Sequence, residues 1–156
     1  MSHRLEPVSR VMAGPLSMLH RACFPEDPWN LSAIAEIMGI AGFFGRIAWE
    51  GQMPDGFALA LDLRKECEIL SLGVSPDRRR IGIGSALLDS ICFEARLRGA
   101  EYIVLEVAVD NSAALALYAK RGFMPVGRRP DYYRQASRQV DARLLRLALS
   151  SPTTPS

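Results

Sequence analysis

The fold is decided by residues 68–85, which read EILSLGVSPDRRRIGIGS. The first seven residues are mostly apolar and end at Ser75-Pro76-Asp77, a pattern that predicts a strand followed by a turn. Beyond the glycines, apolar residues recur at helical spacing from Leu87 to Ala95, which predicts a helix over 83–98. Glycines at such a junction let backbone N–H groups approach a ligand, and the positive end of the helix dipole favours phosphates.

Three consecutive arginines, Arg78 to Arg80, add positive charge beside these glycines, so the junction is interpreted as a diphosphate cradle. The Gly-Lys-Ser/Thr ending of a Walker phosphate loop is absent. A Rossmann site would have a third glycine three residues after Gly84, where Leu87 stands. On these residues alone, an ordinary glycine turn before a helix is the open alternative.

Composition places the chain among globular proteins. Its 156 residues are 49% hydrophobic and 23% charged, which suits one domain, expected over residues 1–149 with a disordered tail at 150–156. The net charge of +2 is too small to indicate a nucleic-acid partner, and no apolar run approaches the roughly 20 residues of a membrane span. The three cysteines form no disulfide or zinc pattern, so we expect a reducing, cytoplasmic location and no metal.

Helices and strands are expected to alternate around a mixed sheet, an α/β (α+β) architecture. The segment 102–109 is nearly all apolar, as buried parallel strands are. Asp55-Gly56 is expected to connect two strands, and Arg64-Lys65 to turn into the next one. The expected strands are 4–8, 41–49, 56–63, 66–75, 102–109, 123–129 and 138–148, and the expected helices are 16–21, 31–38 (capped by Asn30), 83–98 and 112–120.

Further motifs follow in the second half of the chain: Leu105-Glu106-Val107, Asn111-Ser112-Ala113-Ala114, Ala116-Leu117-Tyr118 and Arg121-Gly122-Phe123. With the Arg-x-x-Gly-x-Gly pattern at 79–84, they resemble the motifs of the GNAT N-acetyltransferases. The similarity is closest to the subgroup that acetylates the N-terminal alanine of ribosomal proteins. The segment 127–134 and the loop 24–29, with Phe24-Pro25 and Pro28-Trp29, resemble the same subgroup.

The resemblance implies a single-domain GNAT fold that uses acetyl-CoA as acetyl donor. Backbone N–H groups of residues 80–85 would hold the diphosphate, and the Val74 N–H would stabilise an oxyanion. The main chain of residues 72–74 would pair with the pantetheine arm, and the Asn111 side chain would bond to it. The cofactor-binding residues expected are Leu72, Gly73, Val74, Arg79, Arg80, Ile81, Gly82, Ile83, Gly84, Ser85 and Asn111.

Glu106 is the expected general base and Tyr118 the expected general acid. A carboxylate inside an apolar strand is costly to desolvate unless something pairs with it or uses it. A phenol can return a proton to a departing thiolate. The structural alternatives are a paired or solvent-facing strand glutamate and an aromatic core residue on a helix.

The activity implied by the resemblance is acetyl transfer to a protein N-terminal α-amine, with the N-terminal alanine of a small-subunit ribosomal protein as first choice. Trp29, Tyr132, Tyr133 and Arg134 are the expected acceptor-binding residues, while Trp29 and one tyrosine equally fit loop packing. We expect a monomer or weak dimer without direct nucleic-acid or membrane partners. Acetylation of another amine (a different N-terminus, a lysine or a small molecule) and non-catalytic acyl-CoA sensing are the alternatives.

Two residues depart from the subgroup pattern. Ala108 stands where a basic residue often follows the catalytic glutamate, which would alter affinity or acceptor choice. Gly73 replaces the commoner alanine before the cradle, and is expected to leave more room near the thioester. His3 and His20 have no ligand partners at metal spacing and are expected to be structural or surface residues.

Overall fold

A computed structural model of the chain describes residues 3–79, 81–135 and 138–150, with the backbone alone for 129–135 and 138–139. The tail expected to be disordered lies outside this part from residue 151 onward. Every expected strand and helix is present, with ends shifted by a few residues. In chain order the elements are β1 (Arg4–Pro7), η1 (Arg10–Met12), α1 (Ala13–Cys23), α2 (Leu31–Met38), β2 (Phe43–Glu50), β3 (Met53–Leu63), β4 (Glu66–Val74), η2 (Pro76–Arg78), α3 (Ile83–Leu97), β5 (Tyr102–Ala108), α4 (Ser112–Lys120), β6 (Met124–Gln135) and β7 (Arg138–Ala148).

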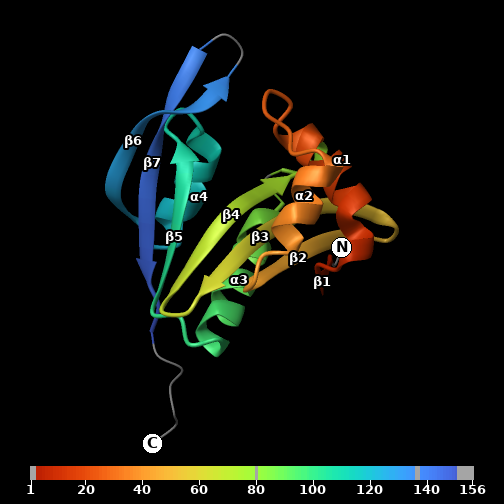
Figure 1. Cartoon of the computed structure of the whole chain (residues 1–156), viewed down its shortest axis with the longest axis horizontal. Helices are drawn as coiled ribbons and strands as arrows, with labels where there is room; N and C mark the ends of the chain where they lie inside the picture. The colour runs from red at the N-terminus through yellow and green to blue at the C-terminus, as the bar shows by residue number, and fades with distance from the viewer. Residues whose placement is uncertain (1–2, 80, 136–137, 151–156) are drawn as a thin grey trace, which may run out of the picture.

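The strands form one mixed sheet with the order β1-β2-β3-β4-β5-β7-β6 (Figure 1). Neighbouring strands pair antiparallel except β4 and β5, which run parallel. A parallel pair needs a long crossover connection, and α3 supplies it between these two strands. The expected α/β architecture with a mixed sheet is therefore confirmed.

Helices cover both faces of the sheet. On one face, Leu16 and Leu19 of α1 and Ile34 of α2 pack against Phe57 and Leu59 of β3. On the other face, α3 and α4 pack over the alternate residues of the same strands, including Ala58 and Ala60. No helix among the described residues is both long and apolar enough to cross a lipid bilayer.

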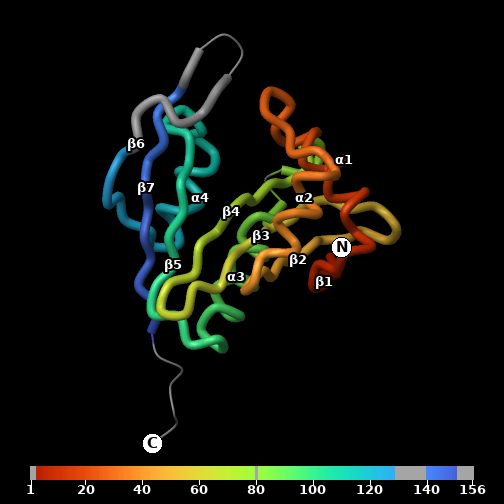
Figure 2. Tube along the Cα trace, in the orientation of Figure 1, coloured from red at the N-terminus to blue at the C-terminus, as the bar shows by residue number. Residues whose placement is uncertain are grey.

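The strands β4 and β5 separate toward their carboxyl ends. Their parallel register runs from Glu66–Tyr102 to Ile69–Leu105, and no later pair joins them among the described residues. The register of β4 with β3 shifts at the same level, where Leu70 is an extra residue of a β-bulge. In the Cα trace, β4 and β5 begin side by side and then diverge (Figure 2).

The two predicted turns have different outcomes. Arg64-Lys65 forms the tight β3–β4 turn as predicted, with Arg64 in the left-handed region at φ 78°. The prediction for Asp55-Gly56 is wrong, because these residues lie inside β3 and the turn falls at Gly51-Gln52. The Asp55 side chain is buried, and its Oδ2 hydrogen-bonds with His3 Nε2 at 3.0 Å.

Candidate active site

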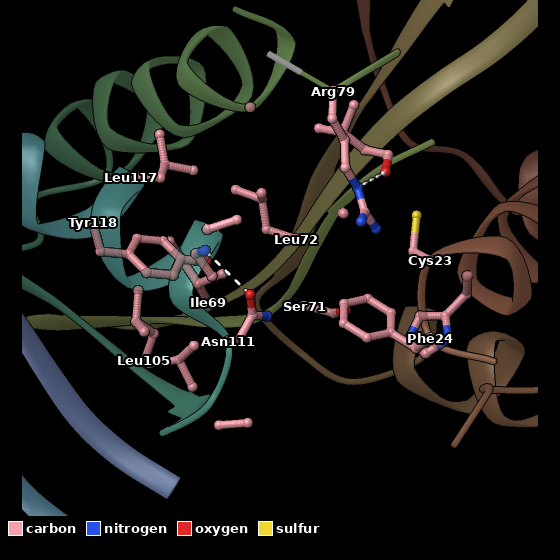
Figure 3. Close-up of a pocket in the computed structure, with 18 of the residues that line it drawn as sticks. Cys23, Phe24, Ile69, Ser71, Leu72, Arg79, Leu105, Asn111, Leu117 and Tyr118 are labelled. Atoms are coloured by element: carbon pink, nitrogen blue, oxygen red, sulfur yellow. Dashed lines mark hydrogen bonds between the residues drawn. The ribbon is translucent and has the colours of Figure 1, made fainter. Parts of the chain in front are cut away.

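A cavity of about 880 Å³ opens where β4 and β5 separate. Its walls come from the second half of β4, the start of α3, the end of β5, α4, and the end of α1 with the loop that follows. Figure 3 shows Leu105, Asn111 and Tyr118 on one side of this cavity and Cys23 and Phe24 on the opposite side. Segments far apart in the sequence therefore meet at this site.

The first turn of α3 forms the cradle end of the cavity, and residues 82–85 all line it. Gly82 is the N-cap of α3 with φ 90°, a left-handed conformation that glycine adopts without strain. Within the described residues, no side chain caps the first N–H groups of α3. These donors and the positive end of the helix dipole make this end of the cavity suitable for an anion.

The arginines beside the cradle have different surroundings. Arg78 forms ion pairs with Glu50 and Asp55 and does not line the cavity. Arg79 lines the cavity, and its Nε donates to the Val74 carbonyl at 3.2 Å (Figure 3). Arg80 lies outside the described residues, and the Ile81 side chain is exposed and does not line the cavity.

Residues 72–74 line the cavity from β4. One edge of this segment pairs with β3, and the other faces away from β5 because the two strands have separated. An extended ligand can therefore hydrogen-bond to this edge as an added strand would. The prediction that Gly73 leaves room is wrong: a Cβ there would lie 2.9 Å from Phe57 Cε1 and 3.0 Å from Cys23 Sγ.

Glu106 lies on β5, one residue beyond the last pair that joins β5 to β4. Leu105 and Val107 turn into the core shared with α3, so the half-buried Glu106 side chain turns to the opposite face of the sheet. Glu106 lines the cavity from that face. The cavity thus reaches both faces of the sheet through the opening between β4 and β5.

Tyr118 lines the cavity from α4, on the α3 face of the sheet. Its side chain is 5% exposed, and its ring packs edge-on against Phe123 with centroids 5.3 Å apart. Figure 3 shows the ring directed from α4 toward the cavity. Tyr118 is therefore a packed core residue and a cavity residue at once, so the two interpretations of this tyrosine do not exclude each other.

Asn111 is the N-cap of α4, and its Oδ1 accepts from the Ala114 N–H at 3.2 Å (Figure 3). This capping bond fixes the side chain at the wall of the cavity, which Asn111 lines. The cap uses only the carbonyl oxygen of the amide. The Nδ2 group can donate to a ligand, as its expected role requires.

The side of the cavity that faces Asn111 and Tyr118 is formed by the loop 24–29 and the end of α1 (Figure 3). Trp29, expected at the acceptor site, lines it, together with Phe24, Pro25, Glu26 and Asp27. The other residues expected there, Tyr132, Tyr133 and Arg134, belong to β6, and their side chains lie outside the described part of the chain. The lining residues of the loop, Phe24, Pro25, Glu26, Asp27 and Trp29, are called the acceptor wall below.

Two residues of α1, His20 and Cys23, line the cavity although the sequence did not predict them as site residues. Burial lowers the pKa of His20 to about 4, against an opposing effect of the Asp27 charge, so the imidazole is neutral near pH 7. Burial raises the pKa of the Cys23 thiol to about 11, although Arg79 beside it acts to lower it. The only sequence signal for His20 was its position on the same helical face as Leu16 and Leu19.

One group of side chains in the described residues has the composition of a metal site. Ligand atoms of His3, Glu50 and Asp55 lie within 4.8 Å of one another. The Arg78 guanidinium already forms ion pairs with both carboxylates, so a cationic group occupies this place. The group does not line the cavity and contributes nothing to its chemistry.

Comparison with known protein families matches residues 16–123 to the acetyltransferase (GNAT) family. The chain belongs to the GNAT acetyltransferase family. It is therefore an acyltransferase, and its sheet and helices are the GNAT fold. The cavity between β4 and β5 is the candidate active site of this GNAT enzyme.

Individual members of the family are similar to this chain in sequence and in structure. The "[Ribosomal protein bS18]-alanine N-acetyltransferase" of Escherichia coli (strain K12) is 32% identical over 123 residues, which cover 79% of this chain and 82% of that protein. A crystal structure of the ribosomal-protein-S18-alanine N-acetyltransferase from Escherichia coli has a TM-score of 0.89 and 24% identity, with 97% of both chains covered. The structure of yncA, a putative acetyltransferase from Salmonella typhimurium with its cofactor acetyl-CoA, has a TM-score of 0.79 at 20% identity, covering 100% of this chain and 99% of that one.

Proposed function

We propose that this GNAT enzyme transfers the acetyl group of acetyl-CoA to the N-terminal α-amine of a protein. The acceptor proposed is the N-terminal alanine of a small-subunit ribosomal protein. The Escherichia coli relative is named as the alanine N-acetyltransferase of ribosomal protein bS18, which supports this choice of acceptor. The observation that carries the proposal is that Glu106 and Tyr118 line one cavity from opposite faces of the sheet.

The residues present suit acetyl-CoA as the donor. The first turn of α3 offers backbone donors for a diphosphate, and the free edge of β4 at residues 72–74 offers main-chain groups for an amide-containing arm. Asn111 lines the same cavity and can donate through Nδ2. When bound, acetyl-CoA would supply an activated thioester at the point where β4 and β5 part.

Glu106 and Tyr118 have opposite tasks in the proposed reaction. Glu106 takes a proton from the acceptor ammonium through a water molecule, which leaves a neutral amine free to form the new bond from nitrogen to the acetyl carbon. The Val74 N–H donates to the oxygen that becomes negative. The attacking nitrogen then carries one extra proton, which it releases to solvent, while Tyr118 gives a proton to the sulfur as the bond from carbon to sulfur breaks and regains one from solvent. The products are an acetylated N-terminus and a free thiol.

A non-catalytic acyl-CoA sensor is the competing proposal from another class. A sensor needs the cradle and the edge of β4, and it has no use for a carboxylate and a phenol on opposite faces of the opening. The presence of both residues therefore favours catalysis. Binding of CoA without thiol release over any amine would favour the sensor.

The test is a thiol-release assay with acetyl-CoA over peptides that differ only at the first residue. Peptides with a blocked N-terminus and a single lysine, and a set of small amines, serve as comparison acceptors. We expect alanine-first peptides to have the highest kcat/KM. A lysine or small amine with a higher kcat/KM would refute the proposed acceptor, and mass spectrometry of the product would show which amine carries the acetyl group.

A further inference from the structure

His20 is a buried titratable side chain that the proposed reaction does not use. It is 3% exposed, and it lies on α1 directly beside the acceptor wall. Burying a polar side chain is unfavourable unless it is hydrogen-bonded, so its partners indicate what it does. Those partners belong to the acceptor wall.

The backbone of Trp29 is held by two side chains of α1. The Trp29 N–H donates to His20 Nδ1 at 3.0 Å, and Ser17 Oγ donates to the Trp29 carbonyl at 3.4 Å. Ser17 and His20 are three residues apart, so they share one face of α1. Since Nδ1 accepts this bond, the neutral imidazole carries its proton on Nε2.

The His20 ring also packs against the side chains of the wall. It stacks on the Trp29 indole with centroids 4.6 Å apart and an interplanar angle of 13°. Its ring centroid lies 4.8 Å from that of Phe24 and, on the sheet side, 5.7 Å from that of Phe57 of β3. The imidazole therefore lies between the sheet and Phe24 and Trp29, the two aromatic residues of the acceptor wall.

We propose that His20 is a positioning residue that fixes the acceptor wall, so that Phe24 and Trp29 limit the size of the first residue that an acceptor peptide can present. The inference rests on the proposed function and adds a residue that sets its specificity. His20 acts through Trp29 and Phe24. Its loss is therefore expected to change acceptor affinity and selection, with little effect on acetyl-CoA binding.

The kinetic test compares two substitutions of nearly equal bulk. His20→Leu removes the acceptor for the Trp29 N–H, whereas His20→Asn places an amide oxygen near the position of Nδ1. One lost buried hydrogen bond corresponds to about a tenfold effect. We expect His20→Leu to raise KM for an alanine-first peptide about tenfold and to weaken its preference over larger first residues. The Kd for acetyl-CoA should change less than twofold, and His20→Asn should recover most of the loss.

A second measurement does not depend on activity. The sequence has two tryptophans, so Trp49→Phe leaves Trp29 as the sole indole reporter. In this background, His20→Leu should shift Trp29 emission to longer wavelength and increase its quenching by acrylamide, because the ring is released from α1. Ser17→Ala removes the other hold on Trp29 and should act in the same direction more weakly. Met18→Ala, on the exposed side of α1, is the matched control and should change neither readout.

The outcomes separate this inference from the proposed function. Unchanged Trp29 emission and unchanged peptide KM in His20→Leu would overturn the role of His20. A fall in kcat alone, without rescue by His20→Asn, would also overturn it, since His20 would then act on the chemical step. If His20→Leu fails to fold, Ser17→Ala and His20→Asn carry the test through the same two readouts. If no peptide is acetylated by the unmodified enzyme, the proposed acceptor fails while the emission measurement still decides whether His20 holds the wall.

Discussion

Glu106 and Tyr118 reach the cavity from different elements, and their positions follow from ordinary rules of strand and helix geometry. Glu106 alternates with buried Leu105 and Val107 along β5, so its side chain turns to the face of the sheet that α1 and α2 cover. Tyr118 is on α4, which packs on the other face. The sequence predicted both residues as candidates, but their access to one shared cavity depends on the separation of β4 from β5. That separation occurs beside a β-bulge, which the sequence pattern did not predict.

Replacing Glu106 by Gln should reduce kcat/KM for the acceptor peptide by about a hundredfold near pH 7, in the range typical of a lost general base. An α-amine has a reference pKa near 8, so the deficit should shrink as pH rises and more amine is already neutral. A pH profile of kcat/KM for both enzymes measures this. An equal deficit at pH 6.5 and pH 9 would contradict the assignment of Glu106 as base.

Replacing Tyr118 by Phe keeps the ring that packs against Phe123 and removes only the hydroxyl. We expect kcat to fall at least tenfold, because the thiolate must then leave without a proton donor. Calorimetry should give an unchanged Kd for acetyl-CoA. Full turnover in Tyr118→Phe would show that another group protonates the sulfur.

The packing of α1 on β4 is a feature at the scale of elements that the sequence did not predict. The strand β4 has to admit a ligand along one edge while α1 packs on its face, and the close contact of Gly73 with Cys23 shows how near α1 comes. The sequence predicted the strand and the helix, but the prediction that Gly73 leaves room near the thioester was wrong, because Phe57 and Cys23 fill that place. Tertiary packing determines which helix lies above a given strand residue. A glycine in the sequence therefore does not show whether a ligand or a protein group fills the space beside it.

Replacing Gly73 by Ala should therefore destabilise the protein by about 1–3 kcal/mol, as overpacking does. The new Cβ would meet Phe57 and Cys23 at 2.9 and 3.0 Å. Adding Cys23→Ala removes the sulfur, so the double variant should lose less stability than the two single losses added together. Urea unfolding of the four proteins gives the coupling energy. Strict additivity would show that the Cys23 sulfur is not the group that excludes a side chain at position 73.

At the scale of the whole molecule, burial of His20 ties stability to pH. The pKa of His20 is about 4 in the folded protein, below the ordinary histidine value of 6.5, so the unfolded chain takes up a proton first as pH falls. Its contribution to stability is complete above about pH 6.5 and is lost as pH falls toward 4. We expect a loss of roughly 2 kcal/mol between pH 7.5 and pH 5 that is absent in His20→Asn, measured by urea unfolding at both values.

A second group titrates in a different window. Hydrogen bonding from Arg98, with Arg46 adding to it, lowers the pKa of Glu94 below its usual value. Its contribution is therefore present at pH 5 and is lost only at lower pH. If the wild type and His20→Asn lose equal stability between pH 7.5 and pH 5, burial of His20 does not account for the acid sensitivity.

The short parallel register between β4 and β5 also affects how the enzyme behaves before any ligand arrives. Beyond Ile69 and Leu105 the described strands no longer pair with each other, so each has an interior edge there that no neighbouring strand covers. Bare edges of this kind are templates for pairing between molecules. A bound donor would cover them, and purified enzyme stored with CoA should accordingly resist aggregation longer than enzyme stored without it.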